Sequence, residues 1–567
     1  RGVIYDRNGR LLVDNRPSFD LSIHLKDAKP LDATVMRLAG YLQEPADSLT
    51  ERIEAGGSTG WLKPVMLKRD IGRDVLAAIE GRRYDLPGID VGVRLLRYYI
   101  DEGMAAHLLG YLGEISPTEL KMPRYAGARG GDLVGKFGVE RSVNELLMGK
   151  RGGRQVQVNV NGQVMRVLKT VSAQPGNDLI LTIDRDLQLK AESLLEGEAG
   201  AVVALDPNNG EILAFASSPS FNQNDFITGM SRESWTELIN NPYRPLENKV
   251  IQGTYPPAST FKIVTAAAGL EEGVITPDET IFCPGHYRFG NRTYRCWRRW
   301  GHGEVDLVKA IAQSCDVYFY QVGQRLGIDR LAWYAKAFGL GQRTGIELDN
   351  EEAGLIPTSD WKMRRFGIPW QGGETLSIAI GQGFNLVTPL QMAVLTAAVA
   401  NGGDRYRPHV IRRVVSPYRQ VIHEQSPEIT GRLPISPATL DWVRTGLWEV
   451  VNGERGTARV AKLKTIDISG KTGTAQVVSR EKLEDRPGAE NVRKFKDHAW
   501  FVAYAPSDAP RIAIAVIVEH GEHGSSTASP IARELVNTYL GPEEELLLPT
   551  APAAVHHLPS RGDAGNG

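Results

Sequence analysis

The segment "YPPASTFKIVTAAAGLEEG" places Ser259 three residues before Lys262, at the start of a predicted helix. Two prolines precede the serine, a periodic apolar run follows, and Gly273 ends the pattern, which predicts a helix of about four turns. Ser259 and Lys262 then lie one turn apart on one helix face. A serine at the positive end of a helix, beside a partly desolvated lysine that can take its proton, is an activated nucleophile.

The same Ser-x-x-Lys spacing recurs at Ser479 and Lys482, so the spacing alone is weak. That second copy lies in a charged stretch without apolar periodicity, and we interpret it as a solvated loop. Two more elements follow Ser259 in order, namely Ser314-Cys315-Asp316 and the strand-like segment Lys471–Thr474, "KTGT". Each element alone has an ordinary structural explanation, as a helix cap or as a turn at a strand end.

The chain needs more than one hydrophobic core, because 567 residues exceed the size at which single cores stop growing. A Pro-Gly turn followed by a β-rich run marks a boundary, which predicts a strand-rich domain at 1–177 and a second domain at 178–543. In the second domain, strands at both ends enclose a mostly helical middle. This order indicates an α+β fold with one antiparallel sheet covered by helices. Residues 544–567 are Pro-, Ala- and Gly-rich and are expected to be disordered.

Charge and hydropathy exclude several functions. The chain has 66 basic and 67 acidic residues, a net charge of −1, so no global field attracts nucleic acid, and we expect no nucleic-acid partner. No stretch reaches the roughly 18 apolar residues that span a bilayer. The given chain is therefore expected to be soluble, and any membrane anchor to lie outside it.

The three ordered elements resemble those of the penicillin-recognising serine transferases. The stretches "RGVIYDRNG", "AAHLLGYLGE" (105–114) and "GKFGVERSVNELLMGKRG" (135–152) are similar to the non-catalytic pedestal of class B penicillin-binding proteins. The stretches "AIGQGFNLVTPLQMA" (379–393) and "DHAWFVAYAP" (497–506) resemble their transpeptidase domain. Asp316 and "WQGGETLSIAIGQG" resemble the members that serve cell elongation in rod-shaped Gram-negative bacteria.

This resemblance implies a serine-type D-Ala-D-Ala transpeptidase of the class EC 3.4.16.4, which β-lactams acylate covalently. Ser259 is expected to attack the D-Ala-D-Ala carbonyl of a peptidoglycan stem peptide while Lys262 accepts its proton. Ser314 is expected to relay the proton to the leaving nitrogen, and Lys471 to supply positive potential. The implied substrate-binding residues are Thr472, Gly473 and Thr474, and the backbone N–H groups of Ser259 and Thr474 form the implied oxyanion hole.

Asp316 departs from the wider pattern, in which an asparagine amide donates to substrate. An ionised carboxylate only accepts hydrogen bonds, so Asp316 is expected to pair with Lys262 or Lys471, and its contact with substrate stays open. A β-lactamase or a carboxypeptidase is a rival reading, but no glutamate lies in a recognisable motif for activating a deacylating water. A penicillin-binding scaffold or sensor that acylates without efficient turnover is the alternative from another class.

The resemblance also implies partners and a location. We expect a RodA-type glycan polymerase and the MreC scaffold to bind the pedestal. The expected location is the periplasmic face of the inner membrane, with a single N-terminal anchor that is absent from this chain. No cofactor is expected for catalysis.

The three cysteines have a separate interpretation. If Ser314 and Asp316 project into the cleft, then Cys315 between them faces the protein interior. Cys283, Cys296 and His302 lie upstream with the spacing Cys-x12-Cys-x5-His-x12-Cys. This set predicts a closed Cys₃His structural zinc site, although it lacks the tight Cys-x-x-Cys knuckle. A Cys283–Cys296 disulfide with Cys315 as a buried thiol, or a free His302 on the surface, remains open.

Overall fold

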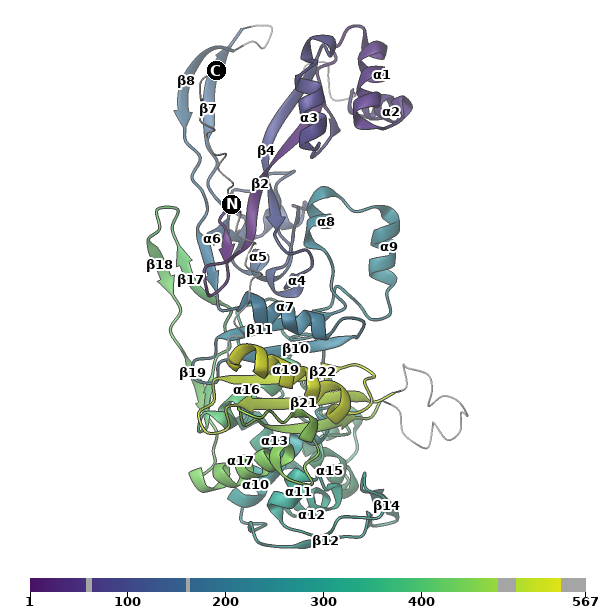
Figure 1. Ribbon diagram of the computed structural model, residues 1–567, viewed down its shortest axis with the longest axis vertical. Helices are drawn as coiled ribbons and strands as arrows, with labels where there is room; N and C mark the ends of the chain where they lie inside the picture. The colour runs from purple at the N-terminus through teal and green to yellow at the C-terminus, as the bar shows by residue number, and fades with distance from the viewer. Residues whose placement is uncertain (58–63, 160–163, 478–495, 542–567) are drawn as a thin grey trace, which may run out of the picture.

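The protein is described by a computed structural model that covers residues 1–57, 64–159, 164–477 and 496–541. It is elongated, with an N-terminal pedestal lobe at one end and a larger lobe at the other (Figure 1). No helix in these ranges is both long and apolar enough to span a membrane. The predicted tail at 544–567 and the second Ser-x-x-Lys at 479–482 lie outside the described residues.

The pedestal combines long strands with helices α1, α2 and α3 at its tip, in agreement with the strand-rich domain that the sequence predicts. Asn8-Gly9 forms the turn of a β-hairpin, in which β1 pairs antiparallel with β2 and Gly9 has φ 81°. The elements of the pedestal are β1 (Ile4–Tyr5), β2 (Leu11–Ile23), α1 (Leu31–Leu42), α2 (Ala46–Gly57), β3 (Val65–Lys68), α3 (Arg73–Glu80), β4 (Ile89–Tyr99), α4 (Ala106–Leu109), β5 (Leu112–Glu114), β6 (Leu133–Gly135), α5 (Gly138–Ser142), α6 (Asn144–Leu147), β7 (Gly153–Val158) and β8 (Val164–Val171).

A buried ion cluster holds the pedestal's base together. Glu140 is fully buried and accepts hydrogen bonds from Arg1 Nε at 2.7 Å and from Arg97 Nε at 2.6 Å. Removing one partner of such a buried set is strongly destabilising. The cluster therefore joins the first residue, strand β4 and helix α5, and gives a physical reason for two of the motifs that resemble the class B pedestal.

One sheet runs across the predicted domain boundary at residue 177. Strand β9 (Asp178–Leu181) pairs parallel with β1 and antiparallel with β17 (Ile411–Val415), in the seven-stranded order β18-β17-β9-β1-β2-β3 with β4 on β2. The larger lobe thus contributes three strands to the pedestal sheet. The boundary itself stays a prediction.

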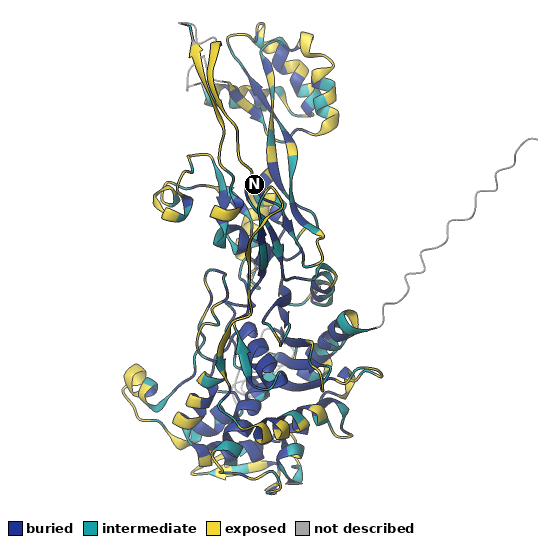
Figure 2. Cartoon of the chain, turned by 90° about the vertical axis from the view of Figure 1, so that its left-hand side faces the viewer, coloured by how far each residue is buried: buried dark blue, intermediate teal, exposed yellow. Residues whose placement is uncertain are grey.

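The larger lobe is built on a five-stranded antiparallel sheet in the order β11-β10-β22-β21-β20, as the sequence predicts. Helices α7 and α19 contact one another and pack on strands β11, β21 and β22, whereas α16 and α17 pack on β10, β22 and β20. Every residue of β22 (Ile512–Val518) is buried, which is typical of a strand covered on both faces. Figure 2 shows the buried residues gathered around this sheet.

The elements that lie between β11 and β20 in the chain form the long, mostly helical middle segment that the sequence predicts. The elements of the lobe are α7 (Arg185–Leu194), β10 (Gly200–Leu205), β11 (Ile212–Ser218), α8 (Gln223–Thr228), α9 (Arg232–Asn240), η4 (Ala258–Phe261), α10 (Lys262–Glu271), β12 (Ile281–Cys283), β13 (His286–Phe289), β14 (Arg292–Arg295), β15 (Gly303–Val305), α11 (Leu307–Ala312), α12 (Asp316–Leu326), α13 (Ile328–Ala337), α14 (Ser359–Phe366), α15 (Gly372–Ala379), α16 (Pro389–Ala400), β16 (Asp404–Tyr406), β17, β18 (Val421–Glu424), β19 (Ile429–Arg432), α17 (Pro437–Asn452), β20 (Ser469–Ala475), β21 (His498–Ala505), β22 and α19 (Ser529–Leu540).

Candidate active site

Ser259 lies in a tight turn of helix that leads into α10. The 3₁₀ segment η4 begins at Ala258 and continues directly into the α-helix at Lys262. Ala258 has φ 51°, a left-handed conformation that costs a non-glycine residue about 1–2 kcal/mol. Its N–H donates to the Gly381 carbonyl at 2.9 Å, which holds the turn in place. Backbone strain therefore sits directly beside the candidate nucleophile.

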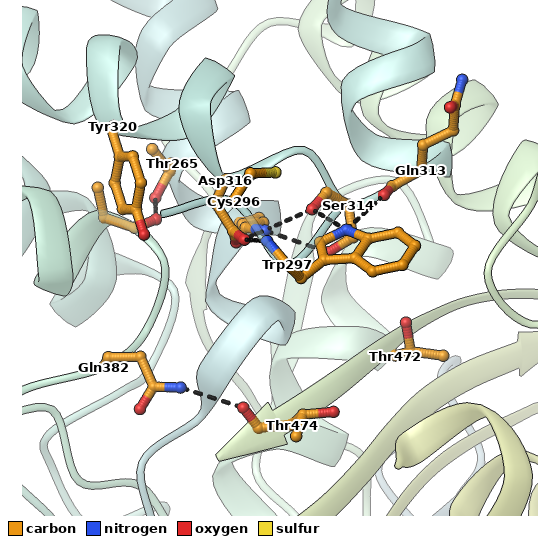
Figure 3. A network of polar contacts seen from close by, with 12 residues as sticks. Thr265, Cys296, Trp297, Gln313, Ser314, Asp316, Tyr320, Gln382, Thr472 and Thr474 are labelled. Atoms are coloured by element: carbon orange, nitrogen blue, oxygen red, sulfur yellow. Dashed lines mark hydrogen bonds and ion pairs between the residues drawn. The ribbon is translucent and has the colours of Figure 1, made fainter. Parts of the chain in front are cut away.

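Gly381 and Gln382 explain the motif "AIGQG". A Cβ at Gly381 would lie 2.0 Å from the Ala258 carbonyl oxygen, so only glycine fits against the serine turn. Gln382 Nε2 donates to the Thr474 carbonyl at 3.0 Å, which connects the motif to strand β20 (Figure 3). This segment therefore contacts both the serine turn and the strand that carries "KTGT".

Lys262 is fully buried and surrounded by acceptors. Its Nζ donates to Asp316 Oδ1 at 2.7 Å, to the Ser314 carbonyl at 3.0 Å and to Ser314 Oγ at 3.1 Å. Of the two lysines expected to pair with Asp316, the structure places Lys262 on its carboxylate. The structure thus brings together Lys262, Ser314 and Asp316, while Ser259 lies one turn before the lysine and is half-buried.

The turn before α12 aims Ser314 and Asp316 at the lysine. Ser314 itself has φ 53°, a second left-handed residue in the site. Trp297 supports this turn: its backbone N–H donates to Asp316 Oδ2 at 2.8 Å, and its indole N–H donates to the carbonyls of Gln313 and Ser314 at 3.0 and 3.1 Å (Figure 3). Both carboxylate oxygens of Asp316 are therefore occupied before any substrate binds.

Lys471 is also fully buried, on the edge strand β20. Burial and the neighbouring charge of Lys262 hold the pKa of Lys471 well below its ordinary value, and the Asp316 carboxylate opposes this shift. Its Nζ donates to the Thr472 carbonyl at 3.3 Å. A buried lysine whose charge has so few hydrogen-bond acceptors and counter-charges around it is typical of a functional site rather than of a position that stabilises the fold.

Gly473 lets the edge strand approach the serine turn. A Cβ at Gly473 would lie 2.9 Å from Trp500 Cβ, 3.2 Å from Thr260 Cγ2 and 3.3 Å from the Pro257 carbonyl oxygen. Thr472 and Thr474 alternate with Lys471 and so share one side of the strand. Thr472 Oγ1 is 3.0 Å from Thr457 Oγ1. All five predicted catalytic residues and the "KTGT" segment thus belong to elements that meet at one site.

The four predicted metal ligands also come together. The Sγ atoms of Cys283, Cys296 and Cys315 and a ring nitrogen of His302 all lie within 4.8 Å of one another. His302 Nδ1 is 3.6 Å from Cys283 Sγ and 3.5 Å from Cys296 Sγ, so the alternative of a free surface histidine is wrong. Cys315 is fully buried, as predicted, and the three cysteines are free thiols.

Three residues of the site are not identified from the sequence: Trp297, Gln382 and Thr457. Trp297 follows the ligand Cys296 directly, but nothing in the sequence signals that its two N–H groups reach the Ser314 turn. Gln382 lies inside a motif that marks the resemblance, so its position could have been noted. Thr457 has no local signal, because its partner Thr472 is on another element.

Comparisons with known proteins agree with this geometry. The family described as "Penicillin binding protein transpeptidase domain" matches residues 200–537, and "Penicillin-binding Protein dimerisation domain" matches residues 1–181. The chain is 38% identical over 554 residues to "Peptidoglycan D,D-transpeptidase MrdA" of Haemophilus influenzae, covering 95% of this chain and 84% of the relative. It is 39% identical over 538 residues to the protein of that name from Acinetobacter baumannii, covering 93% and 78%.

Solved structures show the same fold. Penicillin-binding protein PBP2 of Helicobacter pylori, in a complex with MreC, matches with a TM-score of 0.81 at 31% identity, covering 95% of this chain and 96% of that chain. Pseudomonas aeruginosa PBP2, in complex with WCK 5153, matches with a TM-score of 0.70 at 34% identity, covering 96% of each chain.

The fold and the ordered serine, lysine and "KTGT" elements define a penicillin-binding transpeptidase with a pedestal, an enzyme that transfers an acyl group. Within that class, the chain belongs to the family of the elongation transpeptidase PBP2, the peptidoglycan D,D-transpeptidases named MrdA.

Proposed function

We propose that Ser259 forms the acyl-enzyme and that Lys262 takes its proton. The observation that carries this assignment is the set of three oxygen acceptors around Lys262 Nζ, at 2.7–3.1 Å. A neutral Lys262 amine has two N–H donors for these three oxygens and a lone pair for the serine proton, and once it has taken that proton it is an ammonium with an acceptor for each N–H. Ser314 Oγ, one of these partners, then passes the proton to the leaving D-alanine nitrogen.

Thr472 and Thr474 bind the terminal carboxylate of the donor stem peptide, and the buried Lys471, on the other side of the strand, supplies positive potential. A substrate carboxylate gives the buried Lys471 ammonium the counter-charge that the free site supplies only through Asp316. The backbone N–H groups of Ser259 and Thr474 form the oxyanion hole, where each donor is worth about 3–4 kcal/mol. The Gln382–Thr474 hydrogen bond holds the end of this strand against the serine turn.

The substrate is the D-Ala-D-Ala end of a peptidoglycan stem, and the acyl acceptor is an amine of a neighbouring stem, during cell elongation. β-Lactams acylate the same serine. By analogy with the PBP2–MreC complex of Helicobacter pylori and a peptidoglycan synthase complex that coordinates polymerization and crosslinking, the pedestal binds an MreC scaffold and a RodA-type polymerase. The chain acts at the periplasmic face of the inner membrane.

The experiment that tests this function is crosslinking of nascent peptidoglycan made from lipid-linked precursor by a glycan polymerase. Wild-type protein should produce crosslinked dimers of muropeptides, and Ser259→Ala should produce none. A wild-type protein that binds penicillin covalently but forms no crosslinks would instead be a scaffold or sensor.

A structural zinc ion fits the Cys₃His cluster. Ligand atoms within 4.8 Å of one another match a tetrahedral centre, in which Zn–S is about 2.3 Å and Zn–N about 2.0 Å. Cys283, Cys296, Cys315 and His302 Nδ1 would hold it, and the ion would stabilise the turn that carries Ser314 from behind, without contacting substrate. Protein purified without chelator should contain about one zinc and three free thiols. Absence of metal together with a bridged cysteine pair would contradict this site.

A further inference from the structure

The segment between the cluster ligands Cys283 and His302 carries an unusual concentration of charge. It contains five arginines and no aspartate or glutamate, in a chain whose total charges almost cancel. All five arginines are exposed, and none forms an ion pair with another described residue. These arginines are Arg288, Arg292, Arg295, Arg298 and Arg299.

The hairpin β13–β14 sorts this segment into two faces. Tyr287 pairs with Tyr294 and Phe289 with Arg292, and the three aromatic rings of this face are half-buried against the core. The side chains of Phe289 and Tyr294 fill the space beside Gly372 and Gly373 at the start of α15.

The opposite face points to solvent. Its members pair as His286 with Arg295 and Arg288 with Thr293, and all four side chains are exposed. The exposed basic surface is therefore held rigidly from behind, by aromatic packing on one side and by the Cys₃His cluster at its base.

This surface continues into the active site. Trp297, one residue after the cluster ligand Cys296, hydrogen-bonds the Ser314 turn and is still 56% exposed. Arg298, Arg299 and Trp300 follow it, and Trp300 is 85% exposed with the Arg299 guanidinium 5.3 Å from its ring centroid. Strands β12 and β14 lie at the end of the larger lobe that is farthest from the pedestal tip (Figure 1).

We propose that the five arginines with Trp297 and Trp300, the basic hairpin surface, bind the carboxylate-bearing peptide stems of polymeric peptidoglycan. This inference rests on the proposed function, because it names a binding surface for the same substrate. Arginine pairs bidentately with carboxylates, and flat indole rings pack on sugar and peptide surfaces. A substrate with repeated carboxylates matches a group of exposed guanidinium groups on the segment whose Trp297 contacts the Ser314 turn.

The test compares Arg288→Glu/Arg295→Glu with the control Arg232→Glu/Arg343→Glu. Both pairs are exposed arginines of the larger lobe, and both variants change the net charge equally. Arg288→Gln/Arg295→Gln serves as a milder second variant that keeps hydrogen-bonding groups. The measurements are sedimentation binding to isolated sacculi, crosslinking of nascent polymer, and acylation by a small penicillin, which does not need the surface.

The hairpin variants should bind sacculi about tenfold more weakly, the equivalent of about 1.4 kcal/mol, and crosslink correspondingly less. Their penicillin acylation should stay within about twofold of wild type, and added salt should weaken only wild-type and control binding. Sacculi whose carboxylates are capped as amides should bind wild type as weakly as the variants. The docking role would be wrong if the glutamine variant bound sacculi as tightly as the control variant does. It would also be wrong if the wild-type protein bound phosphatidylglycerol vesicles but not sacculi. Loss of penicillin acylation in wild type would instead refute the catalytic assignment.

Discussion

The two buried lysines of the site should respond oppositely to the same substitution. The Lys471 amine has no solvent exposure and, among the described residues, one hydrogen bond, of 3.3 Å to the Thr472 carbonyl. Desolvating an ammonium costs several kcal/mol, and one long hydrogen bond to a carbonyl does not offset this cost, so burial lowers the pKa of Lys471. Lys471→Met keeps the volume and removes the charge, so we expect the free energy of unfolding to rise by about 1–3 kcal/mol.

Lys262 has the opposite balance. Its ammonium has three acceptors, including Asp316 Oδ1 at 2.7 Å. Lys262→Met leaves the Asp316 carboxylate buried without its cation, which costs about 3–5 kcal/mol. Both variants should fail to form an acyl-enzyme, so stability distinguishes the two lysines where activity does not.

The pH dependence gives a second check on Lys471. Because its pKa is lowered in the folded state, the unfolded chain binds more protons between that pKa and about 10.5, and wild-type stability rises with pH across this window. The advantage of Lys471→Met should therefore be largest at neutral pH and shrink toward about pH 10.

Urea unfolding of the full chain, followed by tryptophan fluorescence from about pH 6 to about pH 10, measures both effects. An increase of 1 kcal/mol corresponds to about 1 °C in the thermal midpoint of a chain this long. A Lys471→Met variant that is less stable than wild type, or whose advantage grows with pH, would refute the description of Lys471 as a destabilising functional lysine.

Three further predictions address the geometry of the site. Gly473→Val should lower the acylation rate by at least about tenfold, because the valine side chain would displace β20 from the serine turn. An unchanged acylation rate, measured by stopped flow with a fluorescent penicillin, would argue against the close approach of β20 to that turn. Trp297→Phe removes the indole donor to Gln313 and Ser314 and should slow acylation about three- to tenfold, an effect that should vanish if the ring only fills space. Ser259→Ala should abolish labelling by fluorescent penicillin and Ser479→Ala should not, and a gel of the two labelled variants shows which serine reacts.

Much of this arrangement follows from local sequence signals. The apolar run of β22 predicts a buried strand, the two prolines before Ser259 and Gly273 after it predict the helix of the nucleophile, and Cys315 faces inward because its neighbours face the cleft. These features depend on periodicity and on the turn chemistry of a few adjacent residues, which a single sequence contains.

Other features depend on contacts between distant segments and leave no local trace. Strand β17 joins the pedestal sheet through pairing with β9, more than two hundred residues earlier, and its own sequence does not reveal that partner. The left-handed backbone of Ala258 and Ser314 breaks local preference, because tertiary contacts such as the Gly381 hydrogen bond impose it. The reach of Trp297 to the Ser314 turn likewise depends on how the hairpin packs.

The central claim is that Ser259 is the residue acylated by a D-Ala-D-Ala substrate. Its most direct test is to trap the enzyme with an acyl-D-alanyl-D-lactate analogue of the stem peptide, digest it and locate the adduct by mass spectrometry. We predict an adduct only on the peptide that contains Ser259, one lactate released per adduct, and no adduct in Ser259→Ala. An adduct on another residue, or the same lactate release from Ser259→Ala, would contradict the account.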